Sequence, residues 1–134
     1  MMRIDRLDHL VLTVADIDRT VRFYCDVLGM HVSVFGGGRT ALAFGRSKIN
    51  LHQVGREFKP NALHAVPGSA DLCLITEDPL ENVLTELAGH GIPVTEGPVQ
   101  RTGALGPLSS LYVRDPDGNL IEISNYPSTN PDAV

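Results

Sequence analysis

The sequence is poor in several features that mark particular classes of protein. Its 134 residues include two cysteines, Cys25 and Cys73, so we expect no disulfide framework, and a reducing compartment suits the chain. It contains no apolar run long enough to span a membrane, and its N-terminus lacks the basic, apolar and small-residue regions of a signal peptide. We therefore expect a cytoplasmic protein.

Positive charge is also scarce, because the formal net charge is −5 at pH 7. This balance argues against nucleic acid or an anionic membrane as a partner. What is present is ordinary for a globular protein: 43% hydrophobic and 20% charged residues, in a length that suits one domain. The expected partners are therefore small molecules or another protein.

The first half of the chain changes its hydrophobic period once. Residues 7–14 alternate and predict a strand, whereas Ile17, Val21, Tyr24 and Leu28 lie at helical spacing. An aspartate precedes this helix as a cap and a glycine follows it. Three short strands are then predicted, at residues 31–35, 40–44 and 48–54.

The second half repeats this order after a proline-containing connector. A strand is predicted at 70–76, a helix ending at Gly91, and strands near Val94, Leu111 and Leu120. We therefore predict an α+β fold of two βαβββ modules, paired in an open eight-stranded half-barrel. The modules are residues 4–57 and 70–127, the connector is 58–69, all within one domain of residues 1–127, and residues 128–134 are an expected disordered tail.

Four polar residues are predicted to share the sheet face that points away from the helices. Alternation places His9 and His52 on this face in module one, and Asp71 and Glu122 in module two. The two residues of each pair have similar separations along the chain, as expected of a duplicated pattern. Two imidazoles with carboxylates suit one divalent ion, either Fe(II) or Zn, Mn, Co or Ni.

Both ends of the chain resemble the vicinal-oxygen-chelate superfamily, which includes glyoxalase I, bleomycin-resistance proteins and extradiol dioxygenases. The stretch "LDHLVLTVADIDRTVRFYCDVLGM" is similar to its opening signature, and "VRDPDGNLIEISNY" to its closing signature. The resemblance spans residues 4 to 127. Internal stretches, "INLHQVG", "HAVPGSADLCLIT" and "EGPVQRTGALGP", look closer to small glyoxalase-domain proteins that are often labelled lactoylglutathione lyase or virulence protein.

The resemblance implies a role for each of the four polar residues. His9 matches the first metal ligand of the superfamily and Glu122 the last. His52 falls where glyoxalase I has a glutamate, and Asp71 falls where it has a histidine, so the ligand types are present in a shuffled order. We expect His9, His52 and Glu122 to bind the metal, and Glu122 or Asp71 to act as general base beside a Lewis-acid cation.

The expected function is a metal-dependent, glyoxalase-like lyase or isomerase that acts on a small metabolite with adjacent oxygens. Two alternatives stay open: an Fe(II) extradiol dioxygenase, and a drug-binding protein of the bleomycin-resistance type without chemistry. The exposed edges of the sheet favour a homodimer. Arg101, expected in a loop, is a candidate for holding a substrate carboxylate or phosphate, and Gly36–Gly38 form a hairpin turn rather than a nucleotide-binding loop.

Overall fold

The computed structural model describes residues 1–128 and divides them into two compact units. The first unit comprises Met1–Ala70 together with Pro116–Gly118, and the second comprises Asp71–Asp115 and the residues from Asn119 onward. The expected disordered tail lies outside the described residues apart from Ser128. Among residues 1–128, none of the helices has the length and apolar character needed to cross a bilayer.

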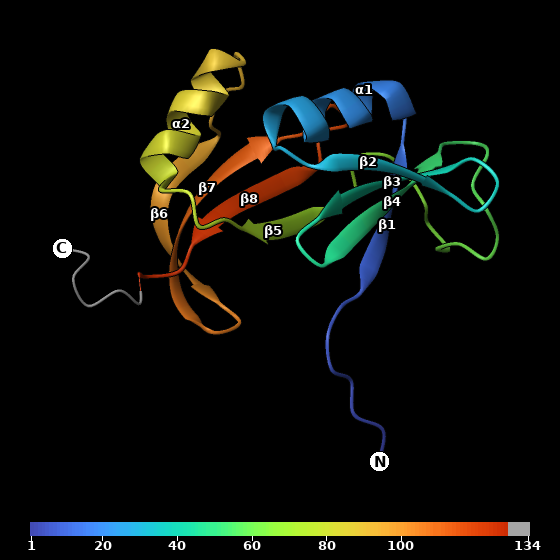
Figure 1. The fold of residues 1–134 in the computed structure, drawn as a ribbon, viewed down its shortest axis with the longest axis horizontal. Helices are drawn as coiled ribbons and strands as arrows, with labels where there is room; N and C mark the ends of the chain where they lie inside the picture. Colours follow the sequence, from blue (N-terminus) through green and yellow to red (C-terminus); the bar gives the residue numbers. More distant parts are fainter. Residues whose placement is uncertain (129–134) are drawn as a thin grey trace. The chain divides into compact units, whose positions relative to one another are not determined.

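Each unit contains one βαβββ module, which Figure 1 traces from blue to red along the chain. The elements of module one are β1 (His9–Val14), α1 (Ile17–Arg22), the π-helical turn η1 (Phe23–Val27), β2 (His31–Phe35), β3 (Arg39–Phe44) and β4 (Ser47–Gln53). Those of module two are β5 (Asp71–Ile75), α2 (Leu80–Gly89), β6 (Glu96–Gly103), β7 (Gly106–Arg114) and β8 (Leu120–Asn125). The predicted α+β fold of two such modules is confirmed.

The two modules have the same sheet topology. The strand order is β1-β4-β3-β2 in the first and β5-β8-β7-β6 in the second. In each, the first strand pairs in parallel with the last, and the other pairs are antiparallel. Parallel pairing needs a crossover connection, which the helix and two intervening strands supply.

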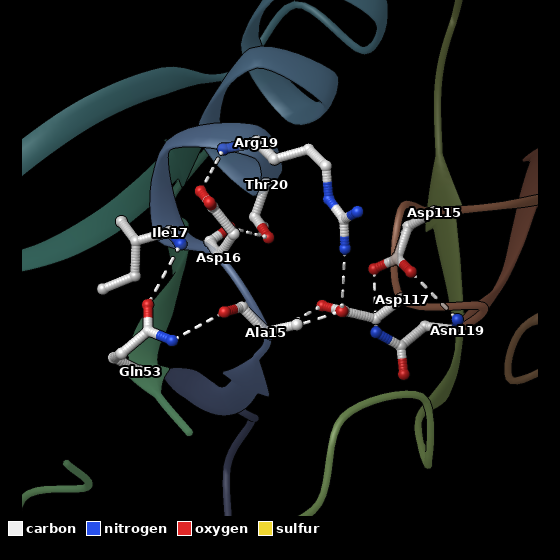
Figure 2. A network of polar contacts seen from close by, with 9 residues as sticks. All are labelled: Ala15, Asp16, Ile17, Arg19, Thr20, Gln53, Asp115, Asp117 and Asn119. Carbon is white, nitrogen blue, oxygen red and sulfur yellow. Dashed lines mark hydrogen bonds and ion pairs between the residues drawn. The ribbon is translucent and has the colours of Figure 1, made fainter. Parts of the chain in front are cut away.

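An amide side chain at the end of the last strand ties each module together. Gln53 donates to the carbonyl of Ala15 (2.6 Å) and accepts from the backbone N–H of Ile17 (3.3 Å), as Figure 2 shows. Asn125 does the same in module two, donating to the Thr76 carbonyl (2.7 Å) and accepting from Leu80 N–H (3.1 Å). Each amide thereby satisfies an orphan N–H at a helix start and joins it to the first strand.

Two details differ from the sequence-based expectation. The predicted first helix ends in a π-helical turn, which brings Phe23 and Tyr24 together on the buried side, with ring centroids 5.1 Å apart. The strand expected near Val94 begins at Glu96 instead and continues to Gly103, so Arg101 lies on a strand and not in a loop. The proline in this segment is tolerated because β6 is an edge strand with a bulge between Glu96 and Val99.

The bulge in β6 depends on Gly97, and this dependence is testable. The residue has a φ of +108°, and an added Cβ would lie 2.5 Å from the Ser110 carbonyl oxygen and 2.8 Å from the Leu111 Cα. Because both neighbours are backbone atoms, Gly97→Ala should lower the free energy of unfolding by about 2–3 kcal/mol. Chemical denaturation should show no comparable loss for the control Gly89→Ala, whose Cβ would meet nothing within 4 Å; equal effects would contradict this account.

Candidate functional site

The strand register decides which polar side chains are neighbours on the face of each sheet that points away from its helix. In module two, Cys73 of β5 lies opposite Glu122 of β8, and Asp71 lies opposite Leu120. Glu122 is therefore one same-face position further along the strands than Asp71. The predicted neighbourhood of Asp71 and Glu122 is consistent with this register.

Asp71 and Glu122 line one pocket of about 350 Å³ in the second unit. Its other lining residues are Thr95, Glu96, Arg101, Tyr112, Arg114 and Leu120. Carboxylate and guanidinium groups thus meet in a single cavity that can take a small polar molecule. Arg101, which the sequence suggested as an anion-holding residue, belongs to this wall.

Arg101 is already engaged by protein groups. Its guanidinium donates to the Tyr112 hydroxyl (3.1 Å), the Gln100 carbonyl (3.0 Å) and a Glu96 carboxylate oxygen (3.1 Å). The hydrogen bond to Tyr112 is the main cause that raises the pKa of Arg101 above its ordinary value. Since its charge is matched by Glu96, Arg101 orients this wall of the pocket more than it adds positive charge to it.

Two buried serines hold one oxygen of Glu122. Ser110 donates from Oγ to Glu122 Oε2 over 2.6 Å, and Ser124 Oγ lies 3.4 Å from the same oxygen and 2.7 Å from Ser110 Oγ. Both serines are fully buried, so the groups that fix the carboxylate are shielded from solvent. These bonds occupy Oε2, and Oε1 is the oxygen of Glu122 that they leave for a ligand or a proton.

Cys73 extends this network at its outer end. Its Sγ lies 3.3 Å from Ser124 Oγ, and desolvation, with Glu122 as a further contributor, raises the pKa of the thiol. The thiol form is therefore favoured, which argues against a nucleophilic role. Cys73 shares the face of Asp71, as alternation along β5 requires, and no sequence signal indicated that Ser110 and Ser124 contact Glu122.

In module one the register separates His9 from His52. His9 of β1 lies opposite Lys48 of β4, whereas His52 lies opposite Thr13. Both histidines are on the same face, but they are four residues out of step, about 13 Å along strands that rise roughly 3.3 Å per residue. The structure does not bring these two predicted ligands together.

The same register identifies Asn50 as the module-one counterpart of Glu122. Asn50 lies opposite Val11, two residues on from His9, as Glu122 lies opposite Cys73, two residues on from Asp71. His52 is instead the counterpart of Ser124. The similar separations read from the sequence had made His52 the counterpart of Glu122, and the strand pairing corrects this equivalence.

The surroundings of His9 and His52 differ in charge. His9 Nδ1 lies 2.8 Å from an Asp8 carboxylate oxygen, a contact that orients the half-exposed ring and leaves Nε2 available. His52 is buried, with the Arg39 guanidinium 3.5 Å from Nε2 and the Phe58 ring at 5.5 Å. A guanidinium beside Nε2 disfavours a metal cation there, so the ligand role of His52 stays a prediction that these contacts do not favour.

Residues 1–128 contain no three His, Cys, Asp or Glu side chains close enough to hold a metal ion together. Each module nevertheless offers two donors that fit a divalent ion. In module one these are the His9 imidazole and the buried Asn50 Oδ1, which has no hydrogen-bond partner among the described residues, and in module two they are the Asp71 and Glu122 carboxylates. Imidazole nitrogen with amide and carboxylate oxygen is a suitable donor chemistry for Zn, Mn, Fe, Co or Ni. The donor types thus fit the group that the sequence predicted.

The remaining histidines carry no such arrangement. His31, His64 and His90 are exposed. His64 of the connector makes no hydrogen bond or ion pair with the proposed site residues among residues 1–128.

Burial of His52 has a measurable consequence for stability. Desolvation, reinforced by the charge of Arg39, lowers the pKa of His52 below its ordinary value of 6.5. The unfolded chain therefore binds this proton more readily, so the stabilisation is fully present above pH 6.5 and is lost as the pH falls through 6.5 toward the folded-state pKa. In His52→Gln, the free energy of unfolding should therefore decline less between about pH 7.5 and 5.5 than in the wild-type protein. The control His31→Gln should decline as the wild type does. Parallel curves for the wild type and His52→Gln would refute this prediction.

Comparisons with known proteins agree with this architecture. Residues 6–123 match the family description "Glyoxalase/Bleomycin resistance protein/Dioxygenase superfamily". The chain is 58% identical over 125 residues to virulence protein STM3117 of Salmonella typhimurium, covering 93% of this chain and 87% of the relative. It is also 58% identical over 120 residues to the glyoxalase domain-containing protein RDO1 of Mycosarcoma maydis, covering 90% and 68%.

Solved structures show the same fold. The crystal structure of STM3117 superposes with a TM-score of 0.93 and covers 94% of this chain and 100% of that one, at 58% identity. An integron cassette protein from the mobile metagenome of V. cholerae gives a TM-score of 0.93 at 56% identity, covering 95% and 99%. The chain belongs to the Glyoxalase/Bleomycin resistance protein/Dioxygenase superfamily.

Proposed function

We propose that this protein is a divalent-metal-dependent lyase or isomerase that acts on a small metabolite with adjacent oxygens. The observation that carries the proposal is the pocket that holds Asp71 together with a Glu122 carboxylate fixed by buried serines. Members of the superfamily typically use a divalent metal, commonly bind small molecules and include enzymes. A pair of carboxylates in different surroundings is what proton transfer within one substrate requires.

We propose His9 and Glu122 as metal ligands, the roles that the resemblance implies for them, and Asn50 as an additional oxygen donor. His9 qualifies because Asp8 holds its Nδ1 and leaves Nε2 for the ion. Glu122 qualifies because the serines occupy Oε2 alone. A bound divalent ion supplies Lewis-acid stabilisation of negative charge that develops on substrate oxygens.

Residues of the second unit supply proton transfer and orient the substrate in the proposed reaction. Asp71, exposed at the pocket, is the carboxylate that takes a proton from the carbon beside a substrate carbonyl and returns it to the neighbouring position. Ser110 and Ser124 keep Glu122 in one orientation. The Tyr112 hydroxyl and Arg101, joined by a hydrogen bond, orient polar groups of the substrate along the same wall.

A homodimer stays part of this proposal. Superfamily members often dimerise, and β2 of module one is an edge strand whose residues from His31 to Val34 are all exposed. Such an edge is satisfied by pairing with another chain.

Metal content tests the ligand assignment. Protein purified without chelator should carry about one divalent ion per chain, and His9→Ala or Glu122→Gln should weaken metal binding by at least about tenfold, because each removes a donor atom. Elemental analysis after dialysis measures this, and His64→Ala is the matched control. Full occupancy in both variants would overturn the assignment, and His52→Ala, measured in parallel, tests that histidine separately.

The identity of the reaction depends on Asp71 and on oxygen. A lyase or isomerase should work with redox-inert Zn²⁺ or with Ni²⁺, should survive strict exclusion of oxygen, and should lose about tenfold or more of its turnover in Asp71→Ala. The assay follows conversion of small 2-oxo and 2-hydroxy compounds under nitrogen. Ring cleavage of a catechol that consumes oxygen and persists in Asp71→Ala would establish the dioxygenase reaction instead. Ligand binding without turnover under either condition would favour the drug-binding alternative.

A further inference from the structure

Module one carries a cluster of cationic and aromatic side chains that the proposed chemistry does not use. Lys48 of β4 places its Nζ 3.8 Å from the centre of the Phe35 ring. The guanidinium carbon of Arg39, at the start of β3, lies 5.4 Å from the same ring and 4.4 Å from the ring of Phe58. Both cations are thus held against one aromatic side chain, on the face of the sheet that points away from α1.

Neither of these two cations makes an ion pair with a carboxylate of the described residues, although Asp8 lies within electrostatic range of Lys48. Arg101 pairs with Glu96, and Arg19 pairs with Asp117. Among residues 1–128, neither Arg39 nor Lys48 has a carboxylate within ion-pair distance. An aromatic ring stabilises a cation less than an ion pair with a carboxylate does. The positive charge of Arg39 and Lys48 therefore remains available to an anion, although the net charge of the chain is −5.

A buried histidine lies beside one of these cations, Arg39. His52 is 3% exposed, and its Nε2 faces a guanidinium, which can only donate, so Nε2 accepts and the hydrogen is on Nδ1. That Nδ1 has no hydrogen-bond partner among the described residues. A buried donor without a partner is uncommon in folded proteins and indicates a group that something else satisfies.

The duplicated module shows that this arrangement is not simply required by the fold. The module-two counterpart of His52 is Ser124, which with Ser110 hydrogen-bonds the carboxylate of Glu122. In module one the neighbouring positions instead hold a histidine and an arginine that contact each other. Where module two has two serines that hold a protein carboxylate, module one has an arginine and a histidine that make no hydrogen bond or ion pair with a carboxylate among the described residues.

We propose that this face of module one is a binding subsite for the anionic group, a carboxylate or a phosphate, of the small-molecule substrate. Arg39 donates through its planar guanidinium, which lies against His52 Nε2, and Lys48 adds a second positive charge. The substrate of the proposed reaction is therefore an anion at neutral pH. This inference rests on the proposed function in one respect, that the bound anion is part of the substrate. Anion binding itself needs no metal.

Anion binding by the chelator-treated protein tests the subsite. Inorganic phosphate and malonate are titrated separately into isotopically labelled protein in EDTA, and amide chemical shifts of module one are followed by NMR. Saturable shifts at residues 35–52 with either anion are expected, and the arm that binds more tightly identifies the favoured group. Arg39→Gln and Lys48→Gln should each raise the dissociation constant by about tenfold or more, as expected for loss of a charge-assisted hydrogen bond.

Matched variants separate this role from packing and from general charge effects. Arg46→Gln and Lys59→Gln remove the same charges from exposed positions and should change the dissociation constant less than about twofold. Arg39→Lys keeps the charge but not the planar fork, so it should retain part of the affinity if Arg39→Gln fails to fold. The proposal is overturned if the wild-type protein shows no saturable shift with either anion, or if the control variants weaken binding as much as Arg39→Gln. The titration contains no metal, so its result does not depend on whether His9→Ala loses metal binding. Equally, a failure to bind anions would not affect the metal-content test.

Discussion

The parallel pairing of the first strand with the last is the constraint on which the rest of each module depends. It fixes which residues lie opposite one another, so that Glu122 lies opposite Cys73 and Asn50 opposite Val11. It also brings the end of the last strand to the start of the helix, where Gln53 or Asn125 bridges the two. A shift of one residue in this register would turn every polar side chain of the site toward the helix.

The two modules use this common frame for different chemistry. Module two places Glu122 between buried serines and beside Asp71 in a pocket, an arrangement suited to moving a proton. Module one has an amide, Asn50, at the position of Glu122, and has His52, in contact with Arg39, at the position of Ser124. Neutral hydroxyl donors can fix the carboxylate of Glu122 in one orientation. An anion that binds from solution is instead attracted by positive charge that no carboxylate neutralises. The proposed division into a reacting half and an anion-holding half follows from this difference.

The arrangement is consistent with the range of reactions named in the superfamily's description. Strand register is set by backbone hydrogen bonds, and the amide bridges by hydrogen bonds between the Gln53 or Asn125 side chain and the backbone. The residues on the open face contribute little to the apolar core. Side chains on that face can therefore change while the fold is kept, and the reaction must be argued from them and not from the fold.

Much of the architecture was determined by the sequence alone, because local periodicity reports directly which side of an element is buried. The duplicated order of elements, the faces of His9, Asp71 and Glu122, and the glycine hairpin were all predictable in this way. Three features were decided only by tertiary structure: the counterpart of Glu122 in module one, the strand position of Arg101, and the contact of Ser110 with Glu122. Counting residues between two strands cannot supply a register when the intervening loops differ in length, and a serine gives no sign in the sequence of the carboxylate across the sheet. Those contacts arise from pairing between strands that are distant in the chain, which is set by hydrogen bonding and packing of the whole module.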